Sequence, residues 1–122
     1  MGFLDDDKKE KLNTFVKFVN DQLELKTVPT ISIQNGRNGL KTTANYDYNK
    51  ENKVVKVNAK NRALVDVMRS IAHELVHHKQ YEQERLKVQP PDIGGEIEDE
   101  ANAKAGQYIK MFSKEDSTIY NE

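Results

Sequence analysis

The run 62–85 constrains the fold of this chain more than any other stretch, because it carries one apolar stripe at helical spacing. The stripe consists of Leu64, Met68, Ile71 and Leu75. At about 100° of rotation per residue, these side chains fall within one narrow sector of a helix. An amphipathic helix buries such a sector, so we expect this face to pack into the core of the protein.

The other elements are shorter and are separated by turn and helix-breaking residues. Two further stretches, 5–25 and 96–112, have the apolar spacing of helices. Between the first and the long helix lie three β-rich runs, "TVPTISIQ", "LKTTANYDYN" and "NKVVKVNA", divided by "NGRNG" and "NKEN". The segment "KVQPPDIGG" ends the long helix, because its prolines and glycines cannot continue it.

This order of elements predicts one α+β domain that spans residues 1–122. We expect an N-terminal helix, a three-stranded and mainly antiparallel sheet joined as a meander, and two C-terminal helices packed on that sheet. The polar segment 113–122 is expected to be a frayed tail. The sequence therefore predicts a small domain in which the last two helices face each other.

Composition excludes several classes of protein and of site. Lys and Arg number 19 against 20 for Asp and Glu, so the chain lacks the basic excess typical of nucleic-acid binders. It contains no cysteine, so any metal must be held by histidine and carboxylate. No run approaches the ~20 apolar residues of a membrane span, and the N-terminus lacks the apolar core of a signal peptide. We expect a cytoplasmic monomer with no nucleic-acid or membrane partner.

All three histidines of the chain lie in the stretch "IAHELVHHKQ". On a helix, His73 and His77 are one turn apart and roughly opposite the apolar stripe, so their imidazoles can converge on one ion. Glu74 projects between the two faces and can reach a metal-bound water. The alternative is a solvated surface pair of histidines. His78 points about 100° away from His77, and a structural role is expected for it.

A zinc site built on this motif needs a third ligand, which must be a carboxylate. The segment "GGEIEDEANAKAG" offers Glu96, Glu98, Asp99 and Glu100. Only Glu98 shares the inward face of the last helix, beside Ala101, Ala105 and Ile109. Because burial of an unpaired charge is costly, Glu98 needs a partner, and a zinc ion would be one. A helix-start carboxylate or a salt bridge to lysine is the alternative.

One polar residue follows Glu98 after a single helical turn. Asn102 lies on nearly the same face, so it could support a ligand histidine through a hydrogen bond. The alternative is an ordinary asparagine in a helix.

The two motifs together resemble the gluzincin metallopeptidases. The chain has "HELVH" and, about two dozen residues later, "EDEAN", similar to the Glu-x-x-Ala-Asn/Asp signature of that group. It looks most like the catalytic cores of the ImmA/IrrE and Ste24/HtpX types, and minimal cores of this sort also occur in phage and mobile elements. The resemblance implies that Glu98 is the third zinc ligand. It departs from the ImmA/IrrE pattern at Lys104, where an aromatic residue is common.

The resemblance implies a zinc-dependent metallopeptidase with Zn²⁺ as cofactor and a peptide or protein as substrate. A zinc-activated water would attack the peptide bond, with Glu74 as general base. The substrate would lie along an edge strand formed by "TTANYDY" or "KVVKVN". The residue that stabilises the oxyanion stays open among Tyr46, Tyr48, His78, Tyr81 and Tyr108. The alternative function is a non-hydrolytic zinc-binding or regulatory module.

Overall fold

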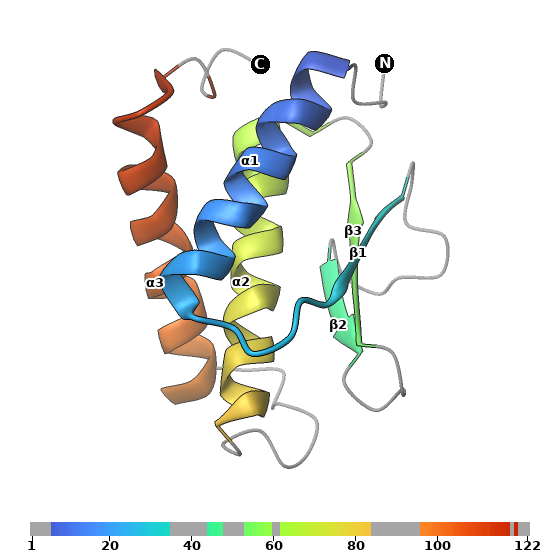
Figure 1. Cartoon of the computed structure of the whole chain (residues 1–122), viewed down its shortest axis with the longest axis vertical. Helices are drawn as coiled ribbons and strands as arrows, with labels where there is room; N and C mark the ends of the chain where they lie inside the picture. Colours follow the sequence, from blue (N-terminus) through green and yellow to red (C-terminus); the bar gives the residue numbers. More distant parts are fainter. Residues whose placement is uncertain are drawn as a thin grey trace.

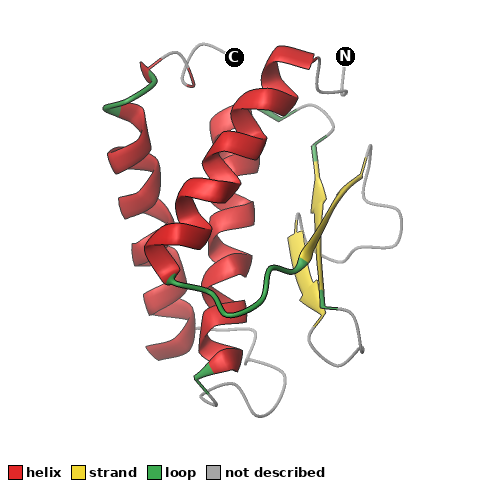
Figure 2. Ribbon diagram, in the orientation of Figure 1, coloured by secondary structure: helices red, strands yellow, loops and turns green. Residues whose placement is uncertain are grey.

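The computed structural model describes residues 6–34, 44–47, 53–59, 62–83, 96–117 and 119. In chain order the elements are α1 (Asp6–Leu23), β1 (Thr30–Gln34), β2 (Ala44–Asp47), β3 (Val54–Asn58), α2 (Leu64–Glu82) and α3 (Glu96–Ser113). All three helices lie on one side of the small sheet (Figures 1 and 2). Helix α2 packs against α1, α3, β2 and β3, so it is the central element of the fold.

Both ends of helix α1 have features that stabilise helix termini. Asp6 and Asp7 occupy its first turn, where the helix dipole favours negative charge. The helix ends in a Schellman motif: the Leu25 N–H donates to the carbonyl of Asn20, and the Glu24 N–H to that of Asp21. The residue in the left-handed position of this motif is Glu24, with φ of 53°. Glycine is the usual residue there, so Glu24 is conformationally strained.

Helix α2 is buried on more than one face. The predicted stripe is confirmed, because each of its four members is at most 1 % exposed. Buried residues also occur outside that stripe, among them Val67, Val76, His77 and Gln80. The sequence pattern did not predict this second buried face, because polar residues occupy much of it. They can be buried there because α3 supplies polar partners as well as apolar contacts.

One arginine fixes the start of α2 against the end of the sheet. The Arg62 guanidinium donates to the Asn58 carbonyl at 2.8 Å, which lies at the end of β3. It also donates to the carbonyl of Asp66 at 3.0 Å and to Ser70 Oγ at 2.7 Å. These bonds tie the first turns of α2 to the end of β3. They do not cap the helix, because Ala63 at the N-cap position offers no side-chain acceptor to its first N–H groups.

The sheet differs from the predicted meander, and the expected mainly antiparallel arrangement is wrong. The strand order is β1-β3-β2, and β1 pairs with β3 in parallel, from Thr30 opposite Val54 to Gln34 opposite Asn58. Strand β2 pairs with β3 antiparallel on the other side. Turn signals indicate where strands end but not which strands pair. Strand β3 lies between the other two, and its Val55 and Val57, which share one face of the strand, are fully buried.

The segment expected to fray contributes to the core. Ile119 is fully buried in the same apolar cluster as Phe112 and Phe15, whose rings meet edge to face with centroids 5.3 Å apart. A short turn follows α3, in which the backbone N–H groups of Glu115 and Asp116 donate to the Phe112 carbonyl. This turn brings Ile119 back over the helices. Among the described residues, none of the helices combines the length and apolar character that a membrane crossing requires.

We expect Glu24→Gly to stabilise the protein by about 0.5–1 kcal/mol, because glycine adopts positive φ without a Cβ clash. Urea unfolding followed by circular dichroism measures the change in the free energy of unfolding. Glu24→Ala is the control, because it removes the charge but keeps the Cβ. It should give less stabilisation than glycine. Equal stability of the glycine variant and the natural protein would contradict the strained conformation at this position.

Candidate metal centre

Helices α2 and α3 bring two histidines and one glutamate together. His73 and His77 lie one turn apart on α2, and their Nε2 atoms are 3.1 Å from each other. Glu98, in the first turn of α3, places Oε2 3.2 Å from His73 Nε2 and Oε1 2.9 Å from His77 Nε2. One potential ligand atom from each residue lies within 4.8 Å of the others. The three residues could therefore hold a metal ion.

The spacing of these atoms fits a small divalent cation. In a tetrahedral zinc site with ligand bonds of about 2.0–2.1 Å, neighbouring ligand atoms lie about 3.3 Å apart. The two histidine nitrogens, 3.1 Å apart, are close to that value, and each has one of the two Glu98 oxygens at a similar distance, 3.2 Å for His73 and 2.9 Å for His77. Two imidazole nitrogens and a carboxylate are also a common donor set for zinc, with a fourth position left open in catalytic sites. The group thus fits the metal in both chemistry and distance.

Glu74 lies beside this group and is held in an unusual electrostatic state. Its Oε1 is 4.0 Å from His73 Nε2, and its side chain is only 11 % exposed. Burial, followed by the negative charge of Glu98, raises the pKa of Glu74 to about 8. A cation bound between His73, His77 and Glu98 would oppose both effects. The carboxyl group is therefore poised to exchange a proton near neutral pH.

His73 is held in the form that binds metal. Burial lowers the pKa of His73, and the nearby ring of His77 lowers it as well. Glu98 and a side-chain hydrogen bond to Asn102 act in the opposite direction. Because a metal binds the neutral imidazole, a lowered pKa extends the pH range in which His73 is available as a ligand.

Asn102 contacts His73, one of the two histidines of the group. A hydrogen bond to a ligand histidine is one of the two alternatives that the sequence leaves open for this residue. Its side chain hydrogen-bonds His73, although the residue itself is largely exposed. The bond gives the His73 ring a partner from α3, the helix that also carries Glu98. Its contribution to metal binding stays a prediction.

The other acidic residues of the first α3 turn do not join the group. Glu96 and Asp99 are exposed, and Glu100 accepts a hydrogen bond from Gln80 at 2.9 Å. The inward spacing that selected Glu98 in the sequence therefore agrees with its position in the structure. Glu98 keeps 23 % of its side chain accessible, so the group opens toward the surface on this side.

Sequence reasoning missed one residue at the site. The second ring nitrogen of His77, Nδ1, lies 2.8 Å from the side-chain oxygen of Gln80. Gln80 is fully buried, which is unusual for a glutamine. The available signal was its position three residues after His77, which places both side chains on one helix face. The sequence gives no reason to expect that this face is covered.

His78 belongs to a different set of contacts. Its Nδ1 lies 2.5 Å from the hydroxyl of Tyr46 on β2, and its Nε2 lies 3.0 Å from the carbonyl of Thr27. Glu82 accepts hydrogen bonds from the backbone N–H groups of Lys26 and Thr27 at 3.0 and 2.9 Å. His78 and Glu82 thereby join α2 to β2 and to the segment before β1. This arrangement agrees with the structural role expected for His78.

The side chains considered as stabilisers of the oxyanion do not share one environment. The Tyr46 hydroxyl is bound to His78, and the Tyr81 ring stacks on His78 while the amine of Lys53 lies 5.0 Å from its centroid. Tyr108 is buried on α3, and burial raises its pKa, followed by the charge of Glu100. Tyr48 and the segment "KVQPPDIGG" that follows the long helix lie outside the described residues, as does the turn "NGRNG".

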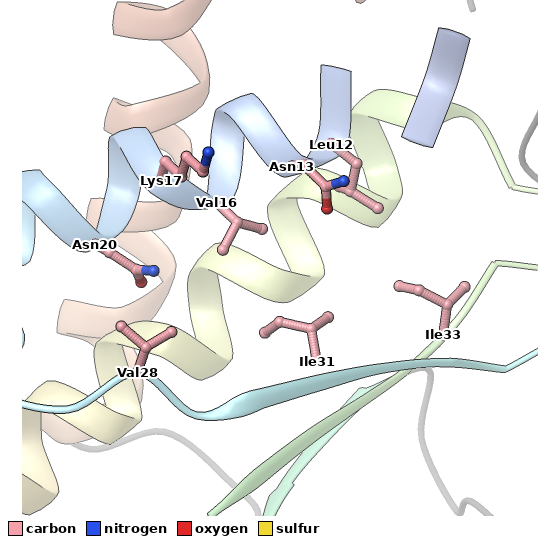
Figure 3. Close-up of a pocket in the computed structure, with 8 residues that line it drawn as sticks. All are labelled: Leu12, Asn13, Val16, Lys17, Asn20, Val28, Ile31 and Ile33. Carbon is pink, nitrogen blue, oxygen red and sulfur yellow. The ribbon is translucent and has the colours of Figure 1, made fainter. Parts of the chain in front are cut away.

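A groove elsewhere on the molecule is separate from the metal group. It runs between α1 and β1, and the side chains of Ile31 and Ile33 point from the strand toward the helix (Figure 3). Its lining residues are Leu12, Asn13, Val16, Lys17, Asn20, Val28, Ile31 and Ile33. None of them belongs to the metal group or neighbours it in sequence. The groove therefore gives no support to the chemistry of that site.

A scan against protein-family models, a search of curated proteins and a search of solved structures each found no match to this chain. The metal-binding geometry therefore rests on the residues themselves.

We expect the metal-free protein to lose stability as the pH rises from about 6.5 to about 8, with no further loss from this group at higher pH. The pKa of Glu74 is about 8 in the folded state and 4.5 ordinarily, so folding retains a proton that the unfolded chain releases. That contribution is complete below pH 4.5 and is lost as the pH rises through about 8. His73 does not interfere, because its lowered pKa acts below 6.5.

Urea unfolding of chelator-treated protein across this pH range measures the decline. Glu74→Gln should remove it, whereas Glu96→Gln, at an exposed carboxylate of α3, should leave it unchanged. A decline of the same size in the Glu74→Gln variant would show that another group is responsible.

Proposed function

We propose that this protein is a zinc-dependent metallopeptidase of the gluzincin type, with Zn²⁺ held by His73, His77 and Glu98. The observation that carries the proposal is the convergence of these three side chains from two helices, with a buried glutamate 4.0 Å from the nearest ligand nitrogen. A metal site with only a structural role has no need of that glutamate. The resemblance of "HELVH" and "EDEAN" to gluzincin motifs supports the same reading.

The proposed chemistry is hydrolysis of a peptide bond. Zinc, when bound, supplies a Lewis acid that lowers the pKa of water toward ~7 and polarises the scissile carbonyl. Glu74 accepts a proton from the attacking water and passes it to the leaving amine. Burial and Glu98 raise the pKa of Glu74 in the metal-free protein, and a bound cation would lower it again, which favours the carboxylate form that accepts the proton.

The proposed substrate position is along the edge of β2. Strand β3 is central and cannot serve as an edge, so "KVVKVN" is excluded in favour of the strand within "TTANYDY". Within the described residues, β2 pairs only with β3. Its Tyr46 packs in one apolar cluster with Ile97, the residue before Glu98. An extended peptide paired with β2 would thus lie next to the metal ligands.

We expect Glu74→Gln to lower kcat for peptide cleavage by about 10²–10⁴-fold, because glutamine cannot accept the proton. Zinc content should stay at one ion per chain, because Glu74 is not a ligand. Cleavage of casein and of a quenched fluorescent peptide library, together with metal analysis of the same samples, provides the measurement. Full activity of this variant would rule out the proposed mechanism.

We expect Glu98→Ala to weaken zinc binding by at least about tenfold, because only two protein ligands remain. Competition with a chromophoric chelator measures the affinity. Glu96→Ala is the matched control, since Glu96 is an exposed carboxylate in the same helical turn. Unchanged affinity in Glu98→Ala would show that the third ligand lies elsewhere. Tight zinc binding without cleavage of any peptide by the natural protein would instead favour the non-hydrolytic module.

A further inference from the structure

Gln80 makes a complete set of hydrogen bonds in the interior between α2 and α3. Its side chain is fully buried in the last turn of α2. The amide oxygen lies 2.8 Å from His77 Nδ1, while the amide nitrogen donates to the Ile97 carbonyl at 3.1 Å and to Glu100 Oε1 at 2.9 Å. Both N–H groups of the amide are used. A buried amide satisfied in this way is held in one position.

These partners fix which way the amide points. The two atoms that face the amide nitrogen, a carbonyl oxygen of Ile97 and a carboxylate oxygen of Glu100, can only accept hydrogen bonds. A flipped amide would place its own oxygen against both of them. The oxygen of Gln80 must therefore face His77, where it accepts a hydrogen bond from Nδ1–H. The lone pair of the His77 ring is then left on Nε2, the nitrogen that faces His73 and Glu98.

The same amide also fixes the helix that carries the third ligand. Ile97 immediately precedes Glu98, and both lie in the first turn of α3. Strain or rotation of this turn would move the Glu98 carboxylate away from the two histidines. One buried side chain therefore sets the tautomer of one ligand and the position of another. Gln80 and Ile97 lie 17 residues apart in the sequence, so no local pattern encodes the hydrogen bond between them.

We propose that Gln80 is a positioning residue of the metal centre, which selects Nε2 of His77 as the ligand atom and secures the turn that presents Glu98. The proposal rests on the metal site of the proposed function but does not depend on peptide hydrolysis. Gln80 touches neither the ion nor a substrate. It acts through His77 and through the first turn of α3.

The test compares Co²⁺ binding in three variants, with affinity measured by chelator competition and coordination by the visible absorption spectrum. Gln80→Met keeps the size of the side chain but removes all three hydrogen bonds. Gln107→Met is the matched control, because it makes the same chemical change on the exposed face of α3. The double variant Gln80→Glu with Glu100→Gln exchanges the acceptor and donor groups between the two positions. Circular dichroism shows whether each variant is folded.

We expect Gln80→Met to bind Co²⁺ about 10–100-fold more weakly and to alter the absorption bands of the bound ion. Gln107→Met should match the natural protein in both respects. The double variant should recover the absorption bands and part of the affinity, because a carboxylate at position 80 still accepts from His77 Nδ1–H and an amide at position 100 can donate to it. Recovery of the affinity is only partial, because the carboxylate cannot donate to the Ile97 carbonyl. Recovery would separate positioning from a general packing role, which the exchange does not restore.

Natural affinity and spectrum in Gln80→Met would overturn the proposal, as would a folded double variant whose affinity and spectrum both match those of Gln80→Met. If Gln80→Met does not fold, the double variant alone decides between these results. A natural protein that binds Co²⁺ but cleaves no peptide would refute the peptidase and leave the role of Gln80 standing. A natural protein that binds no metal would refute both.

Discussion

The packing of α3 against α2 is the contact on which the rest of this structure depends. Helix α2 supplies two histidines at a spacing that any straight helix would give, but two ligands do not make a zinc site. A third potential ligand, Glu98, comes from α3, where the small side chains of Ala101 and Ala105 are buried and permit a close approach of the helices. The sheet and α1 cover the remaining faces of α2. The metal group therefore exists as a product of tertiary packing.

Buried ionisable groups dominate the electrostatics at this contact. Glu74 and Glu98 are two carboxylates close to two imidazoles, and burial pushes the pKa of Glu74 up while it pushes that of His73 down. Each shift reflects the cost of a buried charge without a sufficient partner. A divalent cation would lower that cost for both carboxylates together. The same residues that destabilise the metal-free protein at high pH would then favour metal binding.

Adjacent histidines on one helix have different surroundings because they face different elements. His77 faces α3, and its two ring nitrogens lie against Glu98 and Gln80. His78 faces the sheet, and its ring nitrogens lie against Tyr46 and Thr27. A rotation of about 100° between neighbouring positions is enough to separate a potential ligand from a residue that joins α2 to the sheet.

The sequence alone determined the helices, the different directions in which His77 and His78 point and the inward position of Glu98. All of these follow from local periodicity. The apolar stripe of α2 and the inward face of α3 repeat every three or four residues, so they can be read without a structure. Strand pairing, the burial of Ile119 and the contacts of Gln80 were decided only by the tertiary structure. Each joins segments far apart in the chain. Turn signals had suggested a meander, but β3 lies at the centre of the sheet and pairs in parallel with β1. Local patterns describe which side chains must be buried, but only the complete packing determines what they are buried against.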